Sequence, residues 1–99
     1  MAQLNLSLES LDWLEEIHAY IAKDSPRSAA RVIDGIVEKA ELLRVHPAFG
    51  TRLRTVPEGE IRMLLYGHYR IAYLLRSDAD VIDILGVFHG ALDIDRYLP

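Results

Sequence analysis

The chain has 99 residues, 51% of them hydrophobic, and a formal net charge of -4. This size predicts one domain, residues 1–99, with enough apolar side chains for a core, and the composition argues against intrinsic disorder. Cysteine is absent, which excludes disulfides and thiolate metal sites. No apolar run reaches the roughly 18 residues of a membrane span, and the N-terminus lacks a signal-peptide pattern, so we expect a cytoplasmic protein that does not use a membrane.

The N-terminal third predicts a short strand and a first helix. Leu4 and Leu6 alternate with polar residues, which indicates the strand. Apolar residues then recur at helical spacing over about residues 8–24. Ser7 or Ser10 is the expected N-cap of this helix, because a serine hydroxyl accepts hydrogen bonds from the first free backbone N–H groups.

A second helix is predicted from Ser25-Pro26 to about Val45. Serine is a favoured N-cap, and proline is favoured at the first helical position. His46-Pro47 ends the helix, since the residue before proline disfavours helical geometry. The short connection between the two helices predicts an antiparallel helical hairpin.

The remainder of the chain predicts three strands, over residues 61–66, 70–76 and 81–88. Residues 46–60, which contain two prolines and two glycines, are expected to form a connecting segment. Two short turns join the strands, which favours an antiparallel meander. The third strand is apolar on both faces and is expected to be central, with Asp83 paired to an arginine of a neighbouring strand.

Together these elements predict an α+β fold in the order β-α-α-β-β-β, with an antiparallel sheet. One face of the sheet is expected to pack against the helical hairpin, because this arrangement buries the apolar faces of both helices. The other face is expected to be half open and to carry some of the arginines. Residues 91–98 are expected to form a short helical turn.

Positive charge is concentrated in the middle of the chain. Residues 44–76 hold six arginines and two acidic residues, whereas the segments before and after are each net acidic by four charges. This segment is therefore the expected anion-facing surface, with Arg54, Arg62, Arg70 and Arg76 as candidates for partner contacts. The alternative is that these arginines pair with acidic residues of the same chain.

Two of the arginines suggest a binding patch. Arg62 and Arg70 lie on neighbouring predicted strands joined at Gly67-His68, and we expect their rows to share one face of the sheet. A patch of this kind would bind a phosphate or an acidic partner.

The four histidines show no metal-ligand spacing, so no metal or other cofactor is expected. His89 follows the third predicted strand and precedes Gly90. It is a candidate general acid or base, since histidine titrates near neutral pH, or a structural residue bonded to a neighbouring carbonyl.

The order and spacing of several short motifs resemble the ParE branch of the ParE/RelE toxin superfamily of bacterial type II toxin–antitoxin modules. The resemblance covers nearly the whole chain. It is carried by Tyr20-Ile21-Ala22, Ser25-Pro26 with Ala29-Ala30, His46-Pro47 with Gly50, Tyr69-Arg70-Ile71 with Tyr73, and Ile84-Leu85 with Val87 and His89-Gly90.

The resemblance implies a RelE-like fold and a cognate antitoxin that wraps the toxin in a hetero-oligomer. Such an antitoxin segment would need apolar anchors and acidic residues, and the arginine-rich segment is a suitable receiver. ParE-like members poison DNA gyrase, and RelE-like members cleave messenger RNA on the ribosome. Gyrase poisoning needs only a binding surface. For this activity the resemblance implies contacts with the antitoxin or the target through Arg54, Arg62, Arg70, Arg76 and His89.

The ribonuclease alternative implies a metal-free basic cluster of Arg62 and Arg70 with Tyr97. Two departures count against it: the chain has Leu64 where nucleases often have a basic residue, and Ala91-Leu92 where an arginine is usual. Three hypotheses follow: a gyrase-inhibiting toxin that causes growth arrest, a ribosome-dependent endoribonuclease, and an inactive toxin-fold binding protein.

Overall fold

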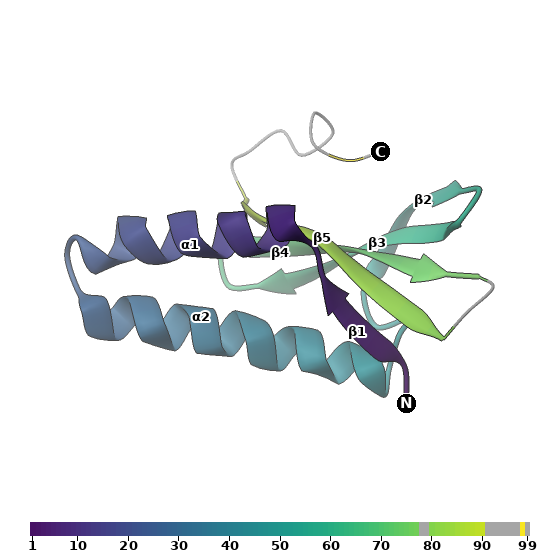
Figure 1. Ribbon diagram of the computed structural model, residues 1–99, viewed down its shortest axis with the longest axis horizontal. Coiled ribbons are helices and arrows are strands. Elements are labelled where there is room, and N and C mark those ends of the chain that lie inside the picture. The colour runs from purple at the N-terminus through teal and green to yellow at the C-terminus, as the bar shows by residue number, and fades with distance from the viewer. Residues whose placement is uncertain (78–79, 91–97, 99) are drawn as a thin grey trace.

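The computed structural model describes residues 1–77, 80–90 and Leu98. In these residues one strand is followed by two helices, a short 3₁₀ turn and four further strands, which is an α+β fold (Figure 1). The elements are β1 Gln3–Leu6, α1 Leu8–Ala22, α2 Pro26–Glu41, η1 Leu42–Arg44, β2 Thr51–Val56, β3 Gly59–Tyr66, β4 Tyr69–Arg76 and β5 Val81–His89. The helical turn predicted for residues 91–98 lies outside the described residues, except for Leu98.

Both helices begin where the capping signals predict. The Ser7 hydroxyl accepts a hydrogen bond from Ser10 N–H (3.0 Å), and the Ser25 hydroxyl accepts one from Ser28 N–H (3.2 Å). Pro26 occupies the first turn of α2, where its missing N–H leaves no hydrogen bond unmade. The two helices lie side by side and run in opposite directions, which confirms the predicted hairpin (Figure 1).

The strands of the described residues form one mixed sheet in the order β1-β5-β4-β3-β2. From β2 to β5 the pairing is antiparallel, which confirms the predicted meander. The N-terminal strand β1 pairs with β5 in parallel, so the sheet is mixed rather than antiparallel throughout. β5 lies inside the sheet between β1 and β4, although the middle strand is β4.

The segment predicted as a connection contains the additional strand β2. Of the described strands it pairs only with β3, and a register shift between Arg52 and Arg54 marks a bulge. An edge strand of this kind is largely exposed and carries charged residues, so its sequence lacks the apolar alternation that indicates a strand.

Apolar side chains fill both faces of the sheet. On the helix-covered face, Ile71, Tyr73 and Ile84 are fully or almost fully buried against residues such as Leu14 and Ile36 of the helices. On the second face a separate cluster contains Ile61, Met63, Ala72, Leu74, Phe88 and Leu98. The second face is therefore apolar along much of its length rather than a mainly basic surface.

Asp83 has the arginine partner that the sequence predicted. Arg76 Nε donates to Asp83 Oδ2 at 2.8 Å, and the amide of Asn5 in β1 donates to Asp83 Oδ1 at 3.2 Å. These bonds join three strands and satisfy a carboxylate that would otherwise interrupt an apolar strand.

Candidate functional site

Arg62 and Arg70 lie on opposite faces of the sheet, so the expectation that they share one face was wrong. Arg62 pairs across the hairpin with Tyr73, whose side chain belongs to the helix-side core. Arg70 pairs with Leu65 on one side and with Phe88 on the other, and Phe88 belongs to the second face. Directly opposed residues of neighbouring strands share a face. A basic cluster containing both arginines is therefore not assembled.

The guanidinium of Arg62 is held by backbone carbonyls and a carboxylate. Its Nη1 donates to Gly50 O (2.7 Å) and to Ala48 O (3.2 Å), and its Nε donates to Glu60 Oε1 (2.9 Å). The side chain is 17% exposed. These contacts use the planar donor fork of arginine to fasten the loop before β2 onto the sheet, which is a structural use of the residue.

Tyr73 fastens the same loop through its hydroxyl. This group donates to Pro47 O (2.8 Å) and accepts from Gly50 N–H (2.9 Å). Burial raises the pKa of Tyr73 above its ordinary value of 10.0, so the hydroxyl stays protonated and able to donate. Tyr73 and Arg62 together hold both ends of residues 47–50.

The ion pairs around Glu60 make a prediction about pH. The hydrogen bond from Arg62 lowers the pKa of the Glu60 carboxyl below its ordinary value of 4.5, against the opposing effect of desolvation, and Arg52 adds to the lowering. Because the folded-state pKa is below the unfolded value, this stabilisation is present above about pH 4.5 and is lost as the pH falls through the lowered pKa. Glu60→Gln is therefore expected to flatten the dependence of stability on pH in this acid range.

The measurement is the urea midpoint of wild type and Glu60→Gln at about pH 7 and at about pH 3. Glu58→Gln is the matched control, since Glu58 is an exposed neighbouring carboxylate in the β2–β3 turn. Equal loss of stability on acidification in Glu60→Gln and wild type would contradict the role of the Arg62–Glu60 pair.

Arg70, His89 and Gly90 meet where β4 begins and β5 ends. Arg70 Nη2 donates to Gly90 O (3.0 Å), and Gly90 N–H donates to His68 O (2.7 Å). His89 pairs with Tyr69, and its ring stacks near the ring of His68 with a centroid distance of 6.4 Å. Arg70 is partly buried, so its side chain both closes this end of the sheet and reaches the surface.

Arg54 and Arg76, the other two arginine candidates, lie on the second face. Arg54 is opposite Ile61 across the β2–β3 pair, and Arg76 lies two residues after the buried Leu74 along β4, so both share the face of the second cluster. Arg76 is bonded to Asp83 as described above. Tyr97, the residue proposed for the ribonuclease alternative, lies outside the described residues.

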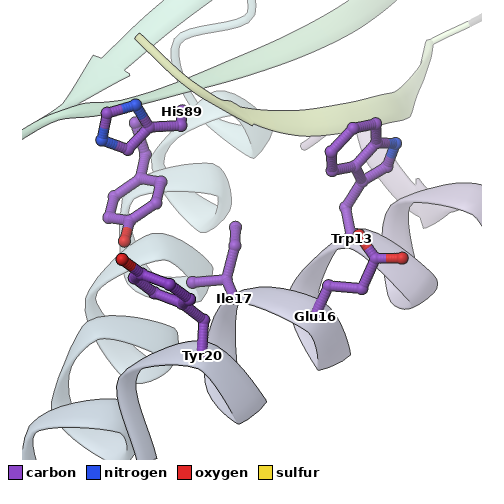
Figure 2. Close-up of a pocket in the computed structure, with 6 residues that line it drawn as sticks. Trp13, Glu16, Ile17, Tyr20 and His89 are labelled. Carbon is purple, nitrogen blue, oxygen red and sulfur yellow. The ribbon is translucent and has the colours of Figure 1, made fainter. Parts of the chain in front are cut away.

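A groove that the sequence did not predict lies between α1 and the ends of β4 and β5. It has a volume of about 520 Å³ and is lined by Trp13, Glu16, Ile17, Tyr20, Tyr69 and His89. Figure 2 shows Trp13 and Glu16 at one end, His89 and Tyr20 at the other, and Ile17 between them. The signal was present in the sequence, because residues four and seven positions apart share a helix face and Trp13, Ile17 and Tyr20 have that spacing.

In the part of the chain that the structure describes, no group of three or more histidine or acidic side chains is arranged to hold a metal ion. None of the helices there is long and apolar enough to cross a membrane.

Comparisons with known proteins agree on a family. A family model described as "ParE toxin of type II toxin-antitoxin system, parDE" matches residues 4–94. The "Putative toxin Y4kP" of Sinorhizobium fredii (strain NBRC 101917 / NGR234) is 32% identical over 83 residues, which cover 84% of this chain and 85% of that protein.

Solved structures show the same fold. The "Chromosomal ParDE TA system from P. aeruginosa" has a chain with a TM-score of 0.70 at 22% identity, covering 90% of this chain and 96% of that one. The isolated E. coli RelE toxin has a TM-score of 0.67 at 15% identity, covering 99% of this chain and 100% of that one. Since the family model spans nearly the whole chain and the curated relative exceeds 30% identity, this chain belongs to the ParE toxin family of type II toxin–antitoxin systems.

Proposed function

We propose that this toxin inhibits DNA gyrase by binding it, without covalent chemistry of its own, and that a cognate antitoxin encoded beside it neutralises the toxin in a hetero-oligomer. Because gyrase acts on the bacterial chromosome, the proposed site of action is the cytoplasm. The family assignment supports the antitoxin partnership, since the matching model describes toxins of parDE systems. The structure similar to this chain from P. aeruginosa is likewise described as a ParDE toxin–antitoxin system.

The observation that favours binding over RNA cleavage is the placement of the arginines. Metal-free cleavage of RNA requires fixed positive charge directed at the developing charge on the phosphoryl group. Arg62 and Arg70 face opposite sides of the sheet, and Arg62 is engaged with Glu60, Ala48 and Gly50. A protein that acts by binding needs no such cluster.

The experiment is induction of the toxin alone in a bacterial culture, beside a culture that also expresses the small reading frame adjacent to the toxin gene. We expect growth arrest with an SOS response and intact transcripts in the first culture, and normal growth in the second. Purified toxin is expected to inhibit supercoiling by gyrase. Normal growth in the presence of folded toxin would support the inactive binding protein instead.

Tyr97→Phe separates the two active hypotheses. The change removes only the phenolic hydroxyl that the ribonuclease alternative needs, so a gyrase-binding toxin is expected to keep full growth arrest. The measurement is colony-forming units after induction, with transcript integrity followed in the same cultures. Restored growth together with loss of transcript cleavage would overturn the gyrase proposal in favour of the ribonuclease.

A further inference from the structure

The groove beside α1 has an aromatic lining and remains accessible at one end. Tyr20 is 74% exposed although it lines the groove, and Tyr69 and His89 meet edge to face opposite it, with ring centroids 5.7 Å apart. Trp13 lies at the other end of the groove (Figure 2). It is half-buried, and its ring packs edge to face on the ring of Phe88 with a centroid distance of 4.8 Å, which fixes its position. Rigid aromatic walls of this kind bury large apolar area at a low entropic cost, and binding hot spots commonly use them.

The charge around the groove is negative. α1 carries four acidic residues and no lysine or arginine. Among the described residues none of these four carboxylates has an ion pair; they are Glu9, Asp12, Glu15 and Glu16. Three of them, Glu9, Asp12 and Glu16, line a second hollow that continues from the groove past Trp13. The apolar groove therefore has an unpaired acidic margin on one side.

The arginine-rich segment offers less unpaired charge than its composition suggests. Within the described part of the chain, at least four of its six arginines lie within 3.4 Å of a carboxylate; they are Arg44, Arg52, Arg62 and Arg76. The unpaired side chains of α1 beside the groove are consequently acidic, with Lys23 at the Tyr20 end. Complementary charge attracts a partner to such a surface and excludes partners of the same sign.

We infer that this groove receives a basic, apolar segment of the cognate antitoxin. An apolar side chain of the segment fills the space over Ile17, between the Tyr20 end and the Trp13 end of the groove, and a lysine or arginine pairs with the Glu16 carboxylate beside Trp13. The cation belongs at the Trp13 end because the ammonium of Lys23 already lies over the Tyr20 ring, 6.0 Å from its centroid. A cation over an indole ring is further stabilised by the ring's quadrupole. The inference rests on the proposed antitoxin partnership.

The first test measures binding of the purified protein encoded by the adjacent reading frame to the full-length toxin by calorimetry. Tyr20→Ala is expected to weaken the affinity about 30-fold, because truncation of an aromatic anchor removes a hot spot. Tyr20 is largely exposed, so the variant is expected to keep the wild-type melting temperature. Leu8→Ala is the matched control, because Leu8 is an 81% exposed apolar residue of the same helix outside the groove. The affinity of the Leu8→Ala variant for the adjacent protein is expected to equal that of the wild type.

The second test reverses one charge. Glu16→Lys is expected to weaken binding about 10-fold or more at low salt, and this difference is expected to shrink at high salt. Glu38→Lys makes the same change in net charge on an exposed position of α2 and is expected to have little effect.

The outcomes separate the two proposals. Wild-type affinity in both Tyr20→Ala and Glu16→Lys, with tight binding of the adjacent protein, would overturn the groove and leave the partnership intact. No binding to the wild-type toxin would overturn the partnership and, with it, the proposed occupant. Stronger binding by Glu16→Lys would show an acidic segment in the groove and would contradict the charge assignment.

Discussion

Gly59→Ala is expected to destabilise the toxin by about 3–4 kcal/mol, a large part of the roughly 5–15 kcal/mol typical of a domain. Gly59 is buried at the start of β3 with a φ of +154°, a region that residues with a Cβ rarely adopt. An added Cβ would overlap the carbonyl oxygen of Leu75 and lie 3.0 Å from the Cα of Arg76. Both obstacles are backbone atoms of β4, so no change of side-chain rotamer relieves the overlap.

Gly67→Ala is the matched control for the Gly59 prediction. Gly67 also has a positive φ, +56°, and lies in the turn between β3 and β4, but a Cβ added there would meet no atom within 4 Å. Only the left-handed strain remains, which costs about 1 kcal/mol. The measurement is the free energy of unfolding from urea titrations with equal m-values. Equal destabilisation by the two changes would contradict this prediction. It would show that the backbone of β4 at Leu75 can move to make room for a Cβ at position 59.

The starts of the helices and the Asp83 pair could be predicted because their causes are local or compositional, whereas α2 ends at Glu41, before the predicted end at about Val45, and continues as the 3₁₀ turn η1. Ser25 and Pro26 are adjacent in the sequence and together indicate the start of α2. A lone aspartate in an apolar strand requires a partner wherever the strand lies, and arginine was the nearest choice of opposite charge. Neither prediction depended on knowing how distant elements meet.

The prediction that Arg62 and Arg70 share a face is wrong because of the residue pairing that the hairpin turn imposes. A two-residue turn at Gly67-His68 pairs Tyr66 with Tyr69, so the numbers of paired residues add up to an odd total. Two even-numbered residues on these strands therefore lie on opposite faces, since side chains alternate with a period of two. The predicted turn at Gly67-His68 therefore already determines that the two arginines lie on opposite faces.

The groove and β2 depend on tertiary contacts that no local pattern contains. β2 is an edge strand whose apolar content is low because only one side pairs. The groove exists because β1 pairs with β5 only as far as Ile84, while α1 brings Trp13 and Tyr20 to the remaining end of β5. The stripe of Trp13, Ile17 and Tyr20 was visible in the sequence, but its position against Tyr69 and His89 was not.

Arg62→Ala is expected to reveal a structural residue at a position that the ribonuclease alternative treats as catalytic. The change leaves Ala48 O, Gly50 O and the Glu60 carboxylate without their shared donor, in a part of the structure where Arg62 is 17% exposed. Loss of a partly buried charged hydrogen-bonding group costs about 2–3 kcal/mol, which corresponds to a fall in melting temperature of roughly 10–20 °C for a chain of this size.

Arg52→Ala is the matched control for Arg62. Arg52 approaches the same Glu60 carboxylate at 3.4 Å, but its side chain is 60% exposed. An exposed pair of this kind contributes about 0.2–1 kcal/mol, so the melting temperature is expected to change little. The comparison isolates the bonds to residues 47–50, which Arg62 makes and Arg52 does not.

Toxicity distinguishes the two roles of Arg62 when it is expressed per folded molecule. If Arg62 fastens the loop, Arg62→Ala lowers the melting temperature, and the fraction that stays folded still arrests growth. If Arg62 acts on RNA, the variant keeps the wild-type melting temperature and loses toxicity completely. Tyr73→Phe provides an independent check, because it removes the hydroxyl that holds Pro47 O and Gly50 N–H in the same loop without altering any charge. Matching losses of stability in the two variants, with toxicity retained per folded molecule, would identify the loop as the element that both residues serve.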